Sequence, residues 1–150
     1  MKVVVQRSKK SSVTINNKLE GSIDHGYVLL VGFTDGDNLE IVDKMINKII
    51  NLRIFEDENE KMNLSILDTK GSILSISQFT LYANSSDGRR PSFINALNPS
   101  EASDLYDEFN KRLSSHIHVE KGIFGADMKV EIYNDGPVTI ILDSDELFKK

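Results

Sequence analysis

A near-continuous apolar run, GYVLLVGFT at residues 26–34, constrains the fold of this chain more than any other feature. An apolar run of this length, bounded by turn-forming residues, is typical of a fully buried strand. It is far too short to cross a bilayer as a helix, which needs about 20 apolar residues. The run therefore predicts a central strand, in a chain whose 150 residues suit one domain with a real core. No linker or repeat divides residues 1–150, so we interpret them as one domain.

Shorter apolar and β-branched runs on either side of this segment predict further strands. They lie at residues 2–7, 11–15, 19–23, 72–79, 127–134 and 138–143. The second and third of these form a hairpin, whereas the last two are separated by Asp135-Gly136-Pro137, for which pattern alone predicts a plain β-turn. A mainly antiparallel or mixed sheet is therefore favoured over a parallel doubly wound one. The tail at residues 144–150 predicts a frayed end or a half-turn.

Two segments have the periodicity of amphipathic helices. In residues 38–53 apolar side chains recur at offsets of 3, 4 and 7, and we expect Asp37 to be the N-cap with Glu40 three residues later. Residues 99–115 predict a second helix with Asn98 as its cap. The expected architecture is an α/β domain with two main helices.

The chain is acidic, with a formal net charge of −5 and a pI near 5.2. Proteins that grip long nucleic acids by their phosphates are usually basic, so we expect any RNA contact to use a small local patch. The absence of cysteine excludes disulfides and thiolate metal sites, and the histidines lack metal-site spacing. The N-terminus lacks a signal-peptide pattern. We expect a cytoplasmic protein with no membrane segment and no metal.

The stretch SQFTL at residues 77–81 places an amide and a hydroxyl where a buried strand would normally have a Val or an Ile. If the strand continues regularly, Gln78 and Thr80 lie at the buried end of the face that Ile76 marks. Each must then be hydrogen-bonded, either to nearby backbone or as part of a pocket floor. Pattern alone favours the backbone. Thr80 has no neighbouring base in sequence that would make it a nucleophile.

The loop GRRPSF at residues 88–93 is the one compact basic stretch besides two Lys-Lys pairs. Arg89 and Arg90 suit phosphate or carboxylate binding. A solvated loop is the simpler interpretation, and composition alone favours it.

Five stretches taken together resemble the D-aminoacyl-tRNA deacylases, also called D-tyrosyl-tRNA deacylases. They are, in chain order, VVVQR with SSVTI, RIF with KMN, SQFTL, RPSF and NDGPVT, and they span nearly the whole sequence. Any one of them is a weak signal, but five in order are a strong one. The family usually has Gly where Glu60 stands and an acid where Asn84 stands. These departures concern a local turn and a peripheral position rather than the active site.

The resemblance implies a homodimer of compact, β-barrel-like α/β subunits with active sites at the subunit interface. It implies hydrolysis of the ester that joins a D-amino acid, and glycine as well, to the 3′-terminal adenosine of tRNA. Free D-amino acid and tRNA are released. The implied partners are the aminoacylated CCA end of tRNA and the second subunit, and no metal or organic cofactor is implied.

The same resemblance implies roles for both signature motifs. SQFTL would form the pocket floor, with Gln78, Phe79 and Thr80 as catalytic residues, and its outer positions Ser77 and Leu81 would contact substrate. The backbone N–H groups of Phe79 and Thr80 are candidates to stabilise the oxyanion.

Gly136 and Pro137 would form a cis element that reaches into the partner's pocket and rejects L-amino acids. A cis peptide turns both flanking carbonyls the same way, and glycine lets the backbone approach closely. We add Arg89 and Arg90, with Lys9 and Lys10, as the local patch that holds the CCA end.

Two mechanisms stay open. In the first, water attacks with help from the 2′-hydroxyl of the terminal ribose, and Thr80 only shapes the pocket. In the second, Thr80 attacks and forms an acyl-enzyme. We favour the first, because no base near Thr80 is evident and an aminoacyl ester is already activated.

Two other functions compete with hydrolysis. One is a non-catalytic module that binds tRNA or DNA on the same fold. The other is a dimeric scaffold or small-molecule-binding protein, which a trans Gly136–Pro137 bond would favour.

Overall fold

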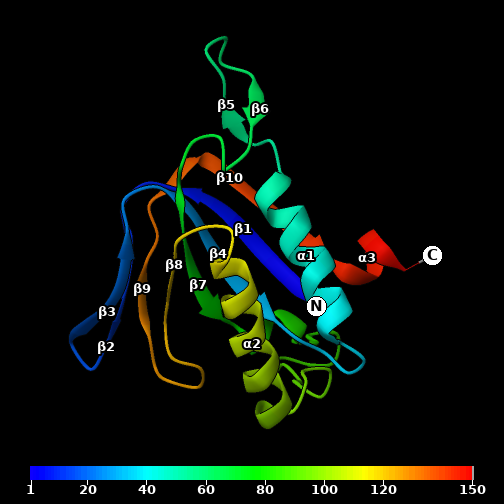
Figure 1. Ribbon diagram of the computed structural model, residues 1–150. Helices are drawn as coiled ribbons and strands as arrows, with labels where there is room; N and C mark the ends of the chain where they lie inside the picture. The colour runs from blue at the N-terminus through cyan, green and yellow to red at the C-terminus, as the bar shows by residue number, and fades with distance from the viewer. Residues whose placement is uncertain (150) are drawn as a thin grey trace.

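The apolar run forms β4 (Gly26–Gly32), the middle strand of a five-stranded sheet, in the computed structural model, which describes residues 1–149. The sheet has the order β10-β1-β4-β7-β8 (Figure 1). Its other strands are β1 (Lys2–Ser8), β7 (Ser72–Ser77), β8 (Val119–Lys121) and β10 (Asn134–Asp143). Strand β1 runs antiparallel to β4 and β10, whereas β7 runs parallel to β4 and β8. The sheet is therefore mixed, as expected.

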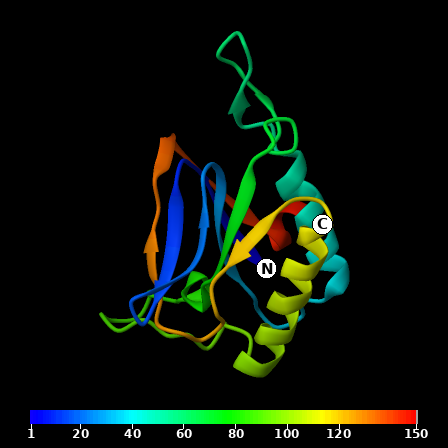
Figure 2. The same cartoon turned by 60° about the vertical axis from the view of Figure 1, so that its left-hand side comes forward.

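Two helices, α1 (Leu39–Asn51) and α2 (Pro99–Ser114), cover one face of this sheet (Figures 1 and 2). The core between them is built from alternate strand residues and the apolar stripes of the helices. It includes Val3, Val5, Leu29, Val31, Ile73, Ile46, Ile49, Phe109 and Leu113. Each helix begins where the sequence offers a capping side chain, and Asn98 accepts from the Glu101 backbone N–H as expected.

The N-cap of α1 is Asn38, not Asp37. The Asn38 side chain accepts from the backbone N–H of Ile41. The Asp37 carboxylate has other partners, because it accepts from the Met1 ammonium at 2.8 Å and from the Thr34 backbone N–H at 2.8 Å. Both side chains can cap a helix, and the long-range ion pair decides which one does.

The other face of the sheet is partly covered by β2 (Ser11–Ile15), β3 (Lys18–Ile23) and β9 (Lys129–Glu131), an antiparallel sheet of order β3-β2-β9. The predicted hairpin at residues 11–23 is confirmed. A second, smaller core joins the two sheets and consists of Val13, Ile23, Val28, Leu74 and Ile76. Strand β9 is shorter than the predicted 127–134.

Three short elements differ from expectation. The acidic turn after α1 is the tip of a hairpin, β5 (Phe55–Glu56) with β6 (Met62–Leu64), that stands clear of the body (Figure 1). The tail forms a short helix, α3 (Ser144–Phe148), capped by Asp143.

The chain is thus a single α/β domain with three α-helices among the described residues. None of the helices within residues 1–149 is long and apolar enough to span a membrane.

Candidate active site

The strand predicted at residues 72–79 ends at Ser77, and the chain then turns into a 3-10 helix, η1 (Phe79–Tyr82). The backbone N–H of Gln78 donates to the Val31 carbonyl at 2.7 Å, which is the last ladder contact. The alternation expected beyond Ile76 is therefore wrong, because Gln78 and Thr80 leave the sheet. They do not share a strand face.

Gly32 allows η1 to cross the end of β4 at close range. A Cβ atom at Gly32 would lie 2.9 Å from the Gln78 carbonyl oxygen and 3.2 Å from the Leu81 Cβ. No larger residue fits without a shift of this turn. Sequence reasoning missed Gly32, since one glycine at the end of an apolar run resembles an ordinary strand terminus.

A cavity of about 550 Å³ opens beside this turn, at the carboxyl ends of β4 and β7. Of the SQFTL residues, Ser77, Gln78 and Phe79 line it. Its other walls are mainly apolar and include Val31, Phe33, Phe93, Leu97, Ala102, Phe124 and Met128. These side chains come from distant segments. Three of the five residues predicted to form a pocket floor therefore line this cavity, whereas Thr80 and Leu81 lie outside its lining.

The side chains of Gln78 and Thr80 bond to each other rather than to backbone. The Gln78 amide Nε2 donates to the Thr80 hydroxyl oxygen at 2.6 Å. Within residues 1–149 no histidine or carboxylate hydrogen-bonds to this hydroxyl. Since a donating amide cannot take up a proton, Thr80 has no general base in this arrangement.

Two aromatic rings form the outer rim of the cavity. Phe79 and Phe93 meet edge to face with their centroids 5.1 Å apart, and they are 54% and 40% exposed. The loop that carries Phe93 is closed by paired backbone hydrogen bonds between Asn84 and Ser92, both 2.8 Å long. Arg89 and Arg90 are exposed in this loop. The loop thus places positive charge near an aromatic rim.

Tyr106 on α2 packs against Phe124, one of the residues that line the cavity, at a centroid distance of 6.1 Å. Its hydroxyl donates to the Ser75 carbonyl at 2.8 Å. Burial raises the pKa of Tyr106, so the phenol stays a neutral donor. The bond ties α2 to β7 two residues before Ser77.

The Gly136–Pro137 bond is cis, which agrees with the implication of the resemblance. The predicted plain β-turn is wrong, because residues 134–143 form one continuous strand, β10. Its register with β1 passes from Gln6↔Thr139 directly to Ser8↔Asn134, so the residues between them form a bulge. A bulge on an edge strand is a place where proline is tolerated, since no ladder N–H is required there.

Arg7 anchors this bulge, and sequence reasoning missed it. Its guanidinium is buried, with Nε donating to the Asp135 carbonyl at 3.2 Å and Nη1 donating to the Ile54 carbonyl at 2.9 Å. The alternation of side chains along β1 could have indicated its burial, because Arg7 continues the inward-facing series of Val3 and Val5. A buried cation at such a position indicates a specific set of acceptors.

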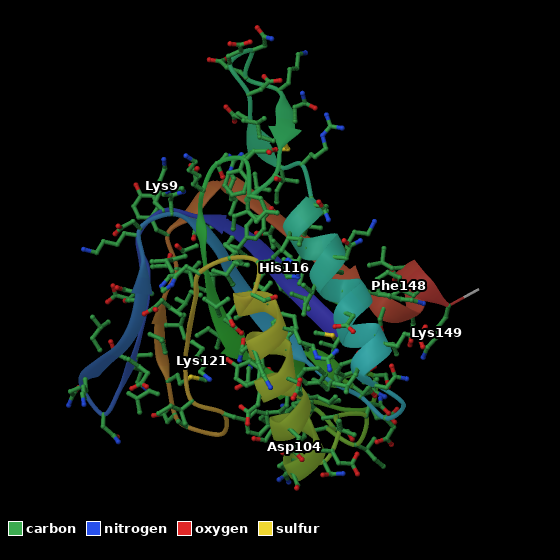
Figure 3. All side chains as sticks on the ribbon, in the orientation of Figure 1. Lys9, Asp104, His116, Lys121, Phe148 and Lys149 are labelled. Carbon is green, nitrogen blue, oxygen red and sulfur yellow. The ribbon has the colours of Figure 1, made fainter. Side chains whose placement is uncertain are left out.

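The two signature motifs lie at opposite ends of the sheet within one chain. Gly26 pairs with Ser8 near the bulge, whereas Gly32 pairs with Lys2 near the cavity. Six residue steps along β4 correspond to about 20 Å. Figure 3 shows the same separation through two labelled residues. Lys9 lies at the bulge end of the molecule, and Asp104, in the first half of α2, lies at the cavity end. Within one chain, Pro137 is therefore far from Gln78. The predicted basic patch is also divided, because Lys9 and Lys10 lie at the opposite end from Arg89 and Arg90.

Fold and site together define a single-domain α/β protein with an apolar pocket at the carboxyl ends of two parallel strands, a usual position for a ligand site. The family model for D-Tyr-tRNA(Tyr) deacylase matches residues 4–143. The chain therefore belongs to the D-Tyr-tRNA(Tyr) deacylase family, which confirms the resemblance. Membership implies a deacylase, and hence a hydrolase, that acts on D-aminoacyl-tRNA.

Two solved structures have the same fold. One, called c-Myc DNA Unwinding Element Binding Protein, is 39% identical with a TM-score of 0.90, and the match covers 95% of this chain and 98% of that one. The other, described as "a probable eukaryotic D-amino acid tRNA deacylase", is 17% identical with a TM-score of 0.81, and the match covers 94% and 97% of the two chains. The second similarity supports the fold alone. Within residues 1–149 no group of three or more His, Asp or Glu side chains is placed to hold a metal ion.

Proposed function

We propose that this protein hydrolyses the ester of D-aminoacyl-tRNA, and of Gly-tRNA, at the turn formed by Gln78, Phe79 and Thr80. The observation that carries the proposal is that Ser77, Gln78 and Phe79 of the SQFTL stretch line the 550 Å³ cavity, in a chain that belongs to the deacylase family. Single-turnover deacylation of D-Tyr-tRNA, L-Tyr-tRNA and Gly-tRNA tests it. Rapid release of D-Tyr and Gly with slow release of L-Tyr is the expected result.

The cavity suits the terminal adenosine of the CCA end. Its walls are mainly apolar, and the exposed ring faces of Phe79 and Phe93 offer stacking surface at its mouth. Stacking on aromatic side chains is a usual way to hold a single-stranded base, and is worth about 1–3 kcal/mol per base. A base bound here would leave the aminoacyl ester near Gln78.

Hydrolysis at this turn relies on positioning and on backbone donors. The N–H groups of Phe79 and Thr80 begin η1, where the first donors of a helix have no partner within it. Directed at the ester carbonyl, they would stabilise the oxyanion, and a single such donor is worth about 10²–10³ in rate in a known protease. Water would attack, with the 2′-hydroxyl of the ribose as the assisting group.

Replacing Thr80 by alanine is expected to keep deacylation within about tenfold of wild type, because Thr80 lacks a base and serves only to shape the turn. Single-turnover rates with D-Tyr-tRNA measure the effect. Thr80→Ser is the matched control, since it retains the hydroxyl and removes only the methyl group. A loss above about a thousandfold in Thr80→Ala but not in Thr80→Ser, with a trapped acyl-enzyme, would establish the nucleophilic mechanism instead.

Rejection of L-amino acids is proposed to come from Gly136 and Pro137 of a second subunit. Both residues are exposed on the bulge, and Arg7 fixes the carbonyl of Asp135 just before them. Since this bulge and the cavity lie at opposite ends of one chain, only another copy can bring them together. Rigid backbone acceptors would meet the α-ammonium of a D-residue and occupy the space that an L side chain requires.

Charge reversal at both Arg89 and Arg90 to glutamate is expected to raise KM for charged tRNA at least about tenfold with little change in kcat, because the loop supplies phosphate contacts but no catalytic group. The salt dependence of kcat/KM should also become shallower. The control is Lys18→Glu with Lys48→Glu, an equal change in net charge at exposed positions outside the cavity lining. An unchanged KM in the arginine variant would exclude this loop from tRNA binding.

Nucleic-acid binding without turnover is the second candidate, and the 39% identical structure favours it because that protein is named for binding DNA. Tight binding of single-stranded DNA with no deacylation of D-Tyr-tRNA above background would support it. The scaffold interpretation is weaker, because Thr80 is exposed rather than buried.

A further inference from the structure

Strands β7 and β8 pair for only three residues, and the cavity lies beyond the point where their pairing ends. The last pair in their parallel register is Ser75 with Lys121. The ladder closes with a bond from the Gly122 backbone N–H to the Ser75 carbonyl at 3.2 Å. Beyond it, β7 leads into the turn at residues 78–81, whereas β8 leads into the loop at residues 122–128. Residues of both continuations line the cavity, so we call the Ser75–Gly122 contact the fork.

The phenol of Tyr106 reaches this fork from α2. Its hydroxyl donates to the same Ser75 carbonyl at 2.8 Å, so one oxygen atom accepts from α2 and from the end of β8. A carbonyl oxygen has two lone pairs and can satisfy both donors. Burial raises the pKa of the phenol, and smaller effects lower it, among them the backbone of Ser77. The hydroxyl therefore lies where α2, β7 and β8 meet, close to the first residue of the SQFTL stretch.

Each of the three segments that meet at the fork supplies a wall of the cavity. Ala102 lies one turn before Tyr106 on α2 and lines the cavity. Phe124, which follows β8, lines it as well and packs on the Tyr106 ring. Ser77 lines it from β7, two residues after Ser75. A movement at the fork would therefore change the spacing between these walls.

The packing behind the fork leaves no slack to absorb such a movement. A Cβ atom at Gly122 would overlap the Sδ of Met128 and would lie 3.6 Å from the Cδ1 of Ile76. Met128 and Ile76 both line the cavity. Because protein interiors are close-packed, a displacement of the Gly122 backbone is passed on to these two side chains.

We propose that Tyr106 is a positioning residue for hydrolysis, whose hydroxyl holds the fork at the width that the substrate terminus requires. Tyr106 is not among the residues that line the cavity, so it acts through β7 and β8 rather than on the ester. The proposal rests on the proposed function, because it assumes that the ester is cleaved at the turn. A base held against Phe124 places its ester at Gln78 only if the two walls keep their spacing.

Tyr106→Phe tests this role, because it removes the hydroxyl and keeps the ring that packs on Phe124. The Ser75 carbonyl retains its bond from Gly122, so the substitution leaves this buried acceptor with a donor. We expect kcat for D-Tyr-tRNA to fall at least about tenfold with KM within about twofold of wild type, because the lost group orients the turn and touches no part of the substrate. Steady-state kinetics measure both constants.

Two control variants separate positioning from a general loss of stability. Phe109→Leu removes packing from the same helix, since Phe109 is fully buried in the main core and lies outside the cavity lining. Tyr27→Phe removes a buried hydroxyl near the opposite end of β4, also outside the cavity lining. Both should keep kcat and KM within about twofold of wild type, whatever their urea midpoints.

Hydrogen exchange provides a readout that does not depend on catalysis. In Tyr106→Phe, amides of residues 77–81 and 122–128 should exchange at least about tenfold faster, because both segments begin at the fork. Amides of β1, which lies outside the fork, should keep their wild-type protection. Unchanged exchange in both segments would overturn the proposal.

The kinetic outcomes distinguish the two levels of the argument. If wild type does not hydrolyse D-Tyr-tRNA, the proposed function fails. If wild type hydrolyses it and Tyr106→Phe keeps the wild-type kcat, only the positioning role fails. An equal loss of kcat in Phe109→Leu would also overturn that role, because it would trace the effect to stability.

Discussion

Replacing Gly136 by valine is expected to lower the ratio of D- to L-Tyr-tRNA hydrolysis by about 100-fold or more, because a misplacement of about 1 Å in a positioning group costs that much. Gly136 has a φ of +125°, which a β-branched residue does not adopt. Its added Cβ would lie 2.8 Å from the Val138 Cγ2 and 3.0 Å from the Arg7 Nη2. The bulge must therefore move, and the proposed chiral filter moves with it. Single-turnover rates with the matched D and L substrates measure the ratio.

Gly36→Val is the control for this substitution. Gly36 also has a positive φ, of +93°, but no atom lies within 4 Å of its added Cβ, and it lies outside the cavity lining and outside the bulge. It tests for the general cost of a strained glycine replacement, and its D to L ratio should equal that of wild type. If Gly136→Val folds, dimerises and retains full selectivity, the bulge is not the filter.

Much of the layered fold was predictable from local pattern. The run at residues 26–34 indicated the central strand, and the stripes of α1 and α2 indicated the helices that cover it. These segments are long and strongly periodic, so each local preference agrees with the final structure. The N-cap of α1 was missed by one residue because the Met1 ammonium, distant in sequence, binds Asp37.

The candidate site was predictable only in part. The family motif located Gln78 and Phe79, which do line the cavity. The continuing strand was wrong because η1 is determined by Gly32 on a different strand, a contact without sequence periodicity. The cavity walls, such as Phe93 and Phe124, come from loops that share no pattern. Long-range placement of this kind cannot be read from local propensity.

The bulge in β10 is a second feature that local sequence preference predicts only in part. Asn134 to Pro137 have strong turn preferences, and these residues do bend the chain. Whether a bend ends a strand or interrupts it depends on what the neighbouring strand offers. Here Asn134 donates to the Arg7 and Val138 carbonyls at 3.0 Å, which holds the two halves of β10 on β1. A side chain therefore replaces the missing ladder bonds.

Replacing Gly32 by alanine is expected to lower kcat/KM for D-Tyr-tRNA by about 10²-fold, because even one methyl group must displace the turn that holds the ester. The added Cβ would lie 2.9 Å from a backbone oxygen, that of Gln78, which cannot rotate away as a side chain would. The accompanying loss of stability should be about 1–3 kcal/mol, the usual cost of overpacking. Steady-state kinetics and urea unfolding measure the two effects separately.

Gly21→Ala provides the comparison for Gly32→Ala. Gly21 also lies in a strand, β3, but its added Cβ meets a side-chain carbon of Glu120 at 3.3 Å, which can yield. It should leave kcat/KM unchanged. A Gly32→Ala variant that loses stability yet hydrolyses D-Tyr-tRNA at the wild-type rate would show that the position of the Gln78–Leu81 turn does not matter for catalysis. Such a result would argue against a catalytic role for that turn, but it would not affect the family membership.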